Sequence, residues 1–225
     1  MLADWRFQRG LKQLAQSRAD ILEAYAAAQW PSRSAPARSA RFLALDFELD
    51  GLKADAHLLQ AGWIPFTADG ISLGQARVFD IRSSRRLEDA AVTTHGIGEQ
   101  RARRGTPLSE VLAALLADLA GRVLVAHCAA IERRALLRAA RNLHGVALPV
   151  RSLCTLAMER HLAPNLVGGE AYRLGPSRQR RGLPAYAAHD ALTDALAAGE
   201  LFLAQLLELP ADTRLGRLER LAFHH

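Results

Sequence analysis

Residues 42–51 read FLALDFELDG, and this stretch puts two carboxylates at the end of an apolar run. The run from Phe42 to Leu45 predicts a buried β-strand. Asp46 and Glu48 follow two residues apart, so on a pleated strand both side chains project from the same face. Two unpaired carboxylates held this close repel each other and resist leaving water. We therefore expect a positive group between them.

The rest of the chain predicts an α/β fold with a mixed sheet. Three strands are expected at 41–48, 58–66 and 71–82, separated by turn signals at Gly51 and at Asp69–Gly70, which indicates an antiparallel meander. Helices and strands then alternate. We expect a helix at 108–121, a strand at 122–127, a helix at 130–142, a strand at 150–154, a helix ending near 162 and a last helix at 189–209.

Three segments lack the regular alternation of strands and helices: residues 1–40, 163–186 and 210–225. Residues 1–40 predict an N-terminal helical segment, with one or two helices over 8–28, followed by a Pro- and Ser-rich linker at 31–40. The main domain is expected over 41–209 and a C-terminal tail over 210–225. Residues 163–186 predict a long loop. The apolar stripe of the N-terminal helices is expected to pack on the domain itself, with a dimer or partner contact as the alternative.

Composition narrows the function classes. The formal charge of +6 weakly favours a polyanionic partner. Two cysteines provide neither a disulfide framework nor a cysteine-rich metal site. No apolar run approaches the roughly 20 residues that span a bilayer, and the charged N-terminus is unlike a secretory signal. We therefore expect a cytoplasmic protein with no membrane partner. The sequence leaves the oligomeric state open.

Acidic and imidazole groups occur in three segments, each near a strand end or a helix start. They are Asp46 with Glu48, Glu132 in VAHCAAIE, and the group His189, Asp190 and Asp194 in HDALTDALAAGELF. Such positions form ligand-binding crevices in open α/β sheets. Taken alone, Glu132 is better explained as a helix-start carboxylate favoured by the helix dipole. Asp190 and Asp194 lie four apart on a helix, so either of them can be the functional carboxylate.

The ordered set of motifs resembles the DEDDh group of 3′–5′ exonucleases, the superfamily of the proofreading ε subunit of bacterial DNA polymerase III. DFELDGL is similar to the first motif, AHCAAIE to the second, HDALTD to the third, and THGI at 94–97 to a His-Gly-Ile sequence of the family. The resemblance spans residues 41–205. It implies an RNase H-like fold, a mixed β-sheet flanked by helices, here with an N-terminal helical extension.

The resemblance also implies a set of site residues. Two divalent cations, Mg²⁺ or Mn²⁺, would be held by Asp46, Glu48, Glu132 and Asp194, and His189 would act as general base. The spacing from His189 selects Asp194 over Asp190, and His127 is expected to be a hydrogen-bonded structural histidine. Substrate contacts are expected from Phe47, Leu52, His95, Arg178, Arg180 and Arg181. A core leucine is the alternative for Leu52, and a solvated loop is the alternative for the three arginines.

The second motif departs from the family pattern. Glu132 stands where the family has aspartate, and Cys128 and Ile131 replace the usual asparagine and phenylalanine. The extra methylene of Glu132 moves its carboxylate by about 1.5 Å. Mg²⁺ tolerates such a change in geometry less well than larger cations do. We therefore expect an active site with an altered metal preference.

The expected function is a metal-dependent exonuclease that removes nucleoside 5′-monophosphates from single-stranded or frayed 3′ ends. The substrate can be DNA or RNA, since the motifs do not distinguish them. A stand-alone enzyme is slightly favoured over a subunit with a polymerase partner, because no long docking tail follows the third motif. The alternative is a nucleic-acid-binding module that keeps the fold but has weakened catalysis.

Overall fold

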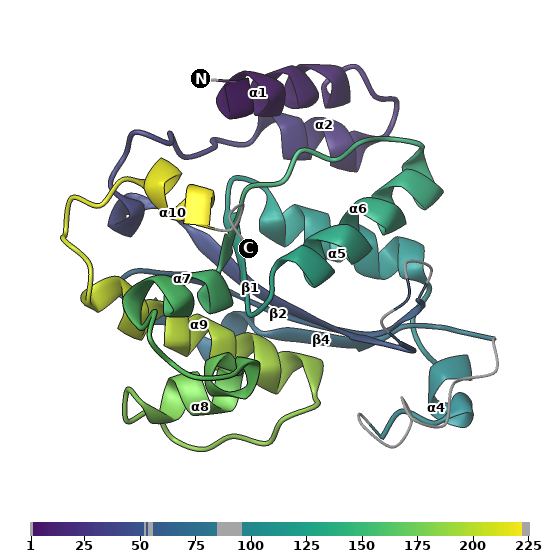
Figure 1. Cartoon of the computed structure of the whole chain (residues 1–225). Coiled ribbons are helices and arrows are strands. Elements are labelled where there is room, and N and C mark those ends of the chain that lie inside the picture. Colours follow the sequence, from purple (N-terminus) through teal and green to yellow (C-terminus); the bar gives the residue numbers. More distant parts are fainter. Residues whose placement is uncertain (1, 52, 54–55, 85–95, 222–225) are drawn as a thin grey trace.

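The computed structural model describes residues 2–51, 53, 56–84 and 96–221. At its centre is a mixed sheet in the order β3-β2-β1-β5-β6, with β4 also paired to β2 (Figure 1). β1 runs antiparallel to β2 and parallel to β5, and β5 runs parallel to β6. The expected mixed α/β fold is confirmed. The strands are β1 (Phe42–Leu49), β2 (Leu58–Thr67), β3 (Gly70–Ile71), β4 (Arg77–Asp80), β5 (Val123–Ala126) and β6 (Ser152–Cys154).

Helices cover both faces of the sheet because β1 sends alternate side chains to each face. Leu43 and Leu45 join the core beneath α1 (Leu2–Leu14), α2 (Asp20–Ala27), α5 (Leu108–Leu119) and α6 (Ala130–His144). Phe42 and Ala44 join the core beneath α7 (Thr155–Leu162), α9 (Ala191–Leu207) and α10 (Leu215–Leu221). Figure 1 shows α1, α2, α5 and α6 on one side of the sheet and α7 and α9 on the other. Asp46 and Glu48 continue the second of these faces.

The two N-terminal helices pack on the domain itself, as expected. Phe7 and Leu11 of α1 and Leu22 and Tyr25 of α2 are buried in the same core as α5 and α6. The Tyr25 hydroxyl donates a hydrogen bond to the Pro149 carbonyl at 2.8 Å, which attaches α2 to the segment before β6. The helical segment is therefore part of the core on that face of the sheet.

The Pro- and Ser-rich stretch after α2 is held by the C-terminal segment. The Ala37 N–H donates to the Thr213 carbonyl at 2.8 Å, and the Leu215 N–H donates to the Ala35 carbonyl at 3.0 Å. Leu215 and Leu218 of α10 are buried. The expected linker and tail are thus paired with each other and closed onto the core.

Three expected elements differ in the structure. The strand expected at 71–82 is divided into β3 and β4 by a 3₁₀ turn at Leu73–Gln75. The loop expected at 163–186 contains a 3₁₀ turn at Gly169–Tyr172 and the helix α8 (Leu174–Gln179). These turns are too short to show a periodicity, and α8 is held by packing of Leu174 on α9. The helix expected at 189–209, α9, begins at Ala191, and a further helix, α10, follows it in the expected tail.

A short helix, α4 (Glu99–Arg103), lies beside the end of β4. None of the helices in the described ranges is long and apolar enough to cross a bilayer.

A candidate metal centre at the end of strand β1

Asp46 and Glu48 lie in the second half of β1, where the strand leaves the fully buried core. Both project from the same face, as the alternation predicts. Phe47 between them projects from the opposite face and is 6% exposed in the core beneath α5 and α6. The Phe47 ring and the carboxylates are therefore on different sides of the sheet, and a contact of Phe47 with substrate stays a prediction.

The third carboxylate, Asp194, comes from the first turn of α9. Asp190 caps this helix, since its Oδ1 accepts hydrogen bonds from the Leu192 N–H at 3.2 Å and the Thr193 N–H at 3.1 Å. Asp190 is therefore the helix cap, and Asp194 is the carboxylate that faces β1, as the spacing from His189 predicts.

Two residues of β2 bring the start of α9 onto the sheet. Gly62 faces Asp46 in the pairing of β1 and β2. A Cβ atom at Gly62 would lie 2.2 Å from the Leu192 nitrogen, so only glycine leaves room for the helix backbone. Gln60 is buried, and its Oε1 accepts a hydrogen bond from the Ala191 N–H at 2.9 Å. Neither residue was predicted from the sequence to belong to the site.

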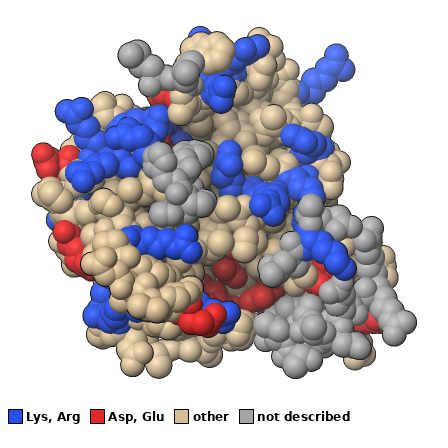
Figure 2. Space-filling view, viewed as in Figure 1, with Lys and Arg blue, Asp and Glu red and all other residues tan. Residues whose placement is uncertain are grey.

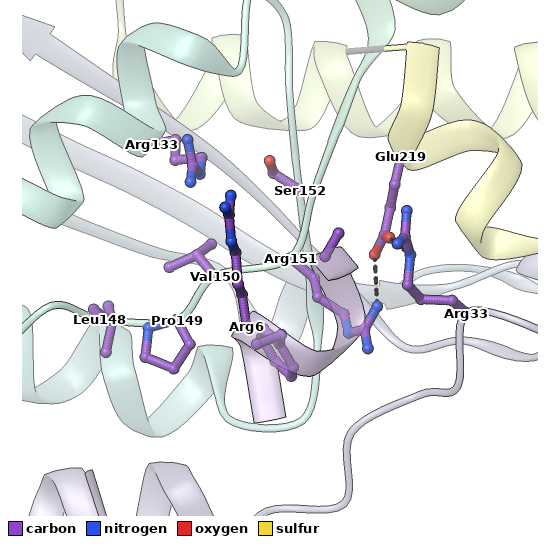
Figure 3. A pocket seen from close by; sticks show the side chains of 11 residues that line it. Arg6, Arg33, Arg133, Leu148, Pro149, Val150, Arg151, Ser152 and Glu219 are labelled. Carbon is purple, nitrogen blue, oxygen red and sulfur yellow. Dashed lines mark hydrogen bonds and ion pairs between the residues drawn. The ribbon is translucent and has the colours of Figure 1, made fainter. Parts of the chain in front are cut away.

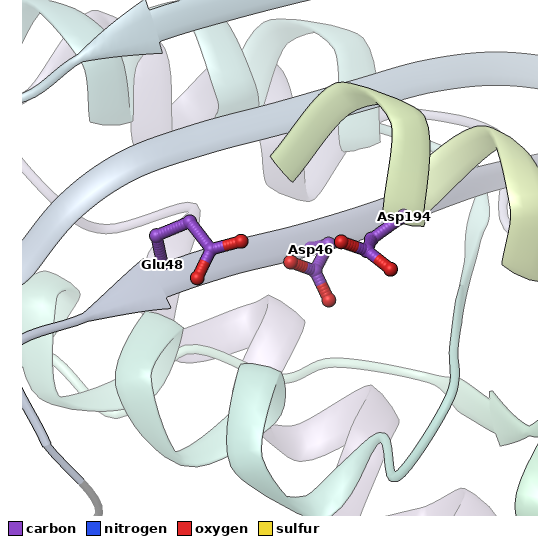
Figure 4. Close-up of side chains that lie close together, drawn as sticks. All are labelled: Asp46, Glu48 and Asp194. Carbon is purple, nitrogen blue, oxygen red and sulfur yellow. The ribbon is translucent and has the colours of Figure 1, made fainter. Parts of the chain in front are cut away.

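These contacts bring three carboxylates together. An oxygen atom from each of Asp46, Glu48 and Asp194 lies within 4.8 Å of the other two (Figure 4). In Figure 2, acidic side chains gather in a hollow in the lower half of the face shown, whereas most Lys and Arg side chains lie above it. A single cation can therefore contact all three side chains after small rotamer changes.

The electrostatics of this cluster favour a bound cation. Burial, followed by the charges of Glu132, Asp194 and Glu48, raises the pKa of Asp46 well above its usual value. Burial and then the charge of Asp194 raise the pKa of Glu48 to about 7. Carboxylates with raised pKa values are destabilised when ionised, and a cation removes that cost. A donor set made only of carboxylate oxygens suits hard cations such as Mg²⁺ and Mn²⁺.

Glu132 lies in the first turn of α6 and is 4% exposed. Its oxygens are not within the group of three, but its charge acts on Asp46. Burial is the main cause that raises the pKa of Glu132 to about 8, and the charge of Glu48 adds to it. Its Oε2 atom is buried and has no hydrogen-bond partner among the residues that the structure describes. A buried carboxylate oxygen with no partner beside an acidic cluster fits a residue that completes a cation site.

His189 and Tyr186 contact Asp194 from the segment before α9. The His189 backbone N–H donates to Asp194 Oδ2 at 2.7 Å, and the Tyr186 hydroxyl donates to Asp194 Oδ1 at 2.9 Å. His189 has a positive φ of 70°, which turns the chain into the helix cap, and its side chain is exposed. Tyr186 was missed by the sequence analysis because it belongs to none of the motifs.

A cleft of about 610 Å³ opens beside the cluster. Its wall includes Asp46, Asp194 and His189, together with His127 and residues of α8. His127 Nδ1 lies 2.9 Å from the Thr155 hydroxyl, which agrees with the expected structural role. Burial lowers the pKa of His127 to about 4, so its imidazole is neutral at neutral pH.

The three arginines expected to guide phosphates are engaged within the fold. Arg178 is 2% exposed and donates to the Ala197 carbonyl at 2.8 Å. Arg180 and Arg181 donate to the fully buried Glu159 at 2.8 Å and 2.6 Å. The alternative of a solvated loop with free basic side chains is therefore wrong. A buried, ionised carboxylate such as Glu159 is stable only when cationic side chains pair with it. Arg178 alone of the three lines the cleft. A contact of these arginines with substrate stays a prediction.

Arg173 is a basic side chain of the cleft that the sequence analysis missed. It lines the cleft, its side chain is 71% exposed, and it pairs with Glu170, whose side chain is 79% exposed. Two further expected contact residues, Leu52 and His95, lie outside the described residues.

Comparison with known families gives a match over most of the chain. Residues 43–202 match the profile of the family described as RNase_T, Exonuclease. This range contains Asp46, Glu48, Glu132, His189 and Asp194 and excludes α1, α2 and α10. No curated protein sequence matches the chain.

Solved structures share the fold. E. coli Exonuclease I in complex with a dA16 oligonucleotide has a TM-score of 0.63 and 20% identity over 83% of this chain and 44% of that chain. The zinc-bound E. coli Exonuclease I complex with single-stranded DNA has a TM-score of 0.61 and 20% identity over 75% and 40%. Exonuclease X in complex with 5′ overhanging duplex DNA has a TM-score of 0.59 and 20% identity over 80% and 99%. The chain spans about two fifths of the Exonuclease I chains.

Proposed function

The chain belongs to the RNase_T family of exonucleases, and on this premise we propose that it is a metal-dependent 3′–5′ exonuclease. It would hydrolyse the terminal phosphodiester of a single strand or a frayed end and release a nucleoside 5′-monophosphate. The observation that carries this proposal is the convergence of Asp46, Glu48 and Asp194 within 4.8 Å at the mouth of a cleft.

The cation site would be built from four side chains. Asp46, Glu48 and Asp194 would hold divalent metal, and Glu132 would turn its unpartnered Oε2 toward the same site. When bound, a pair of divalent cations supplies an activated water and neutralises charge on the phosphodiester oxygens. We propose Mg²⁺ or Mn²⁺, with Mn²⁺ favoured because the longer Glu132 side chain requires a less strict geometry.

His189 would take the proton of the attacking water at an imidazole nitrogen. Its side chain is exposed in the cleft that also contains Asp46 and Asp194. Its backbone N–H holds Asp194 Oδ2, and Tyr186 holds Asp194 Oδ1. These two contacts would keep the Asp194 carboxylate oriented while the imidazole stays free to exchange its proton.

We propose DNA as the substrate to test first. The solved structures of similar fold include Exonuclease I bound to single-stranded DNA and Exonuclease X bound to duplex DNA with an overhang. RNA is the alternative substrate, and a subunit with a polymerase partner is the alternative to the slightly favoured stand-alone enzyme. Arg173 would meet the phosphates of an entering strand, since it is the most exposed of the cationic side chains that line the cleft.

A binding module with weakened catalysis is the second candidate. The position of Glu132 outside the group of three carboxylates favours it, because a fourth ligand out of reach would leave the cation pair incomplete. The two candidates differ in turnover. The test is incubation of a 5′-labelled single-stranded oligonucleotide with Mg²⁺, Mn²⁺ or EDTA. A ladder that shortens from the 3′ end only with metal supports the exonuclease, and binding without shortening refutes it.

A further inference from the structure

A second pocket, of about 440 Å³, is lined by residues of α1, α6, α10 and the chain entering β6 (Figure 3). Four arginines line it, together with one carboxylate: Arg6, Arg33, Arg133, Arg151 and Glu219. Of these, Arg6, Arg33 and Glu219 lie outside the residues 43–202 that match the exonuclease family. The terminal segments of this chain therefore supply one part of the pocket wall, and α6 and the chain before β6, both within the matched range, supply the rest.

Two of the four arginines are part of the fold. Arg151 is 5% exposed and pairs with Glu219 and with Asp4 of α1. Its guanidinium also lies 4.4 Å from the centre of the Phe7 ring. Arg33 pairs with the other oxygen of Glu219. The acidic groups at the pocket are thus already engaged, and the Nε atom of Arg151 is buried without a partner.

The other two arginines have no anionic partner. Among the residues that the structure describes, the side chains of Arg6 and Arg133 have no ion pair, hydrogen bond or ring contact. Their side chains extend toward one another across the pocket in Figure 3. Like charges that converge in a concave site repel each other unless an anion lies between them. Guanidinium groups bind phosphate oxygens in a two-pronged geometry that matches this arrangement.

The remaining wall of the pocket is apolar. This apolar part is formed by Phe7, Leu148, Pro149 and Val150. The volume of the pocket falls in the range of sites that bind small organic molecules. A bare phosphate ion would leave this wall without a contact. A phosphate joined to a sugar and an aromatic ring would use both halves of the pocket.

We propose that this pocket binds a nucleoside monophosphate, with its phosphate between Arg6 and Arg133 and its ring against the apolar wall. The inference does not require the proposed hydrolysis, although that reaction would release the same class of molecule. Binding is therefore measured in EDTA, where turnover is absent, so the two proposals fail separately.

The test is calorimetric titration of the full chain with adenosine 5′-monophosphate in EDTA. We expect one saturable site. The Arg6→Ala/Arg133→Ala variant should bind at least about tenfold more weakly, since two charge-assisted contacts are lost. The matched control is Arg9→Ala/Arg134→Ala, which removes the same charge from the exposed surfaces of the same two helices outside this pocket. The control should bind like the unchanged chain. Asp46→Ala should also bind the nucleotide normally.

Several outcomes would overturn the proposal. One is the absence of saturable binding, and another is an equal loss in both double variants, which would indicate diffuse electrostatic attraction. Inorganic phosphate that binds as tightly as the nucleotide would reduce the pocket to a simple anion site. A 5′-phosphorylated oligonucleotide that binds more tightly, through the same two arginines, would make a strand end the ligand. Because Arg6 and Arg133 hold no partner, their loss should leave the unfolding midpoint of the ligand-free chain unchanged or slightly higher.

Discussion

Asp46 and Gly62 face one another in the register of β1 and β2, and the side chain that Gly62 lacks would occupy the place of the first turn of α9. The position of Asp194 beside Asp46 depends on this close approach of helix to sheet. A glycine on a neighbouring strand is therefore as important to the geometry of the carboxylates as the carboxylates themselves.

Gly62→Ala should disrupt the site and the fold together. The added Cβ would meet helix backbone at 2.2 Å, which no side-chain rotation can relieve. We expect a loss of about 1–3 kcal/mol or more in the free energy of unfolding and a loss of metal binding. Gly74→Ala is the control, because nothing lies within 4 Å of its Cβ position. Urea unfolding of both variants checks this, and equal stability would contradict the packing argument.

Divalent metal should stabilise the chain through the carboxylate cluster. Added Mn²⁺ should raise the melting temperature measured in metal-free buffer, since a ligand held at 100 times its Kd adds about 2.7 kcal/mol. Asp46→Asn should remove most of this increase and should itself raise the melting temperature without metal, because it relieves repulsion. Glu170→Gln, at an exposed carboxylate away from the cluster, should respond like the unchanged chain. A metal response that survives Asp46→Asn would exclude this site.

Substitution of Glu132 separates a metal ligand from a helix-start carboxylate. If Glu132 completes the cation site, Glu132→Asp should keep or improve hydrolysis, most clearly with Mg²⁺, whereas Glu132→Ala should abolish it. The physical reason is that aspartate restores the reach expected for the family, and alanine removes the oxygen. The measurement is the rate of 3′ shortening with each metal. Near-native rates in both variants would rule out the ligand role.

His189→Asn should slow hydrolysis by roughly 10²–10⁴-fold, as expected for loss of a general base. Asparagine is chosen because it tolerates the positive φ of 70° at this position better than alanine does. Because the His189 side chain is exposed, the unfolding midpoint should stay unchanged. His161→Gln, at another exposed histidine, serves as control. Rates are compared under single-turnover conditions, and an unaltered rate would remove His189 from the mechanism.

His127 should make the stability of the chain depend on pH. Burial holds the pKa of folded His127 near 4, below its usual value of 6.5. The unfolded chain therefore binds a proton first, so this contribution to stability is complete above about pH 6.5 and declines as the pH falls toward 4. His127→Gln, which keeps a partner for Thr155, should lose less stability over this interval. Urea unfolding at several pH values checks this, and parallel curves for the two proteins would contradict it.

Local sequence patterns were sufficient for most of the fold. Alternation and apolar runs predicted β1, β2 and β5 closely, because each is a strand with a buried face whose period is visible in the sequence. The same patterns predicted one or two helices over 8–28, where the structure has α1 from Leu2 and α2, and they predicted the long helix that carries Asp194. They failed for α8 and for the break between β3 and β4, because turns this short are stabilised by their neighbours and carry no period of their own.

The sequence by itself determined that Asp46 and Glu48 share one face of a strand, because that relation depends only on backbone periodicity. It also placed Asp194 five residues after His189, in a segment that predicts a helix. Only the tertiary structure decided that these groups meet. Their proximity depends on Gly62, which leaves room for the start of α9 against the sheet, and on Gln60, which accepts a hydrogen bond from it. It also depends on Tyr186, whose hydroxyl orients Asp194. The tertiary structure also assigned Arg180 and Arg181 to the buried Glu159, because a charge removed from water requires a partner wherever the fold provides one.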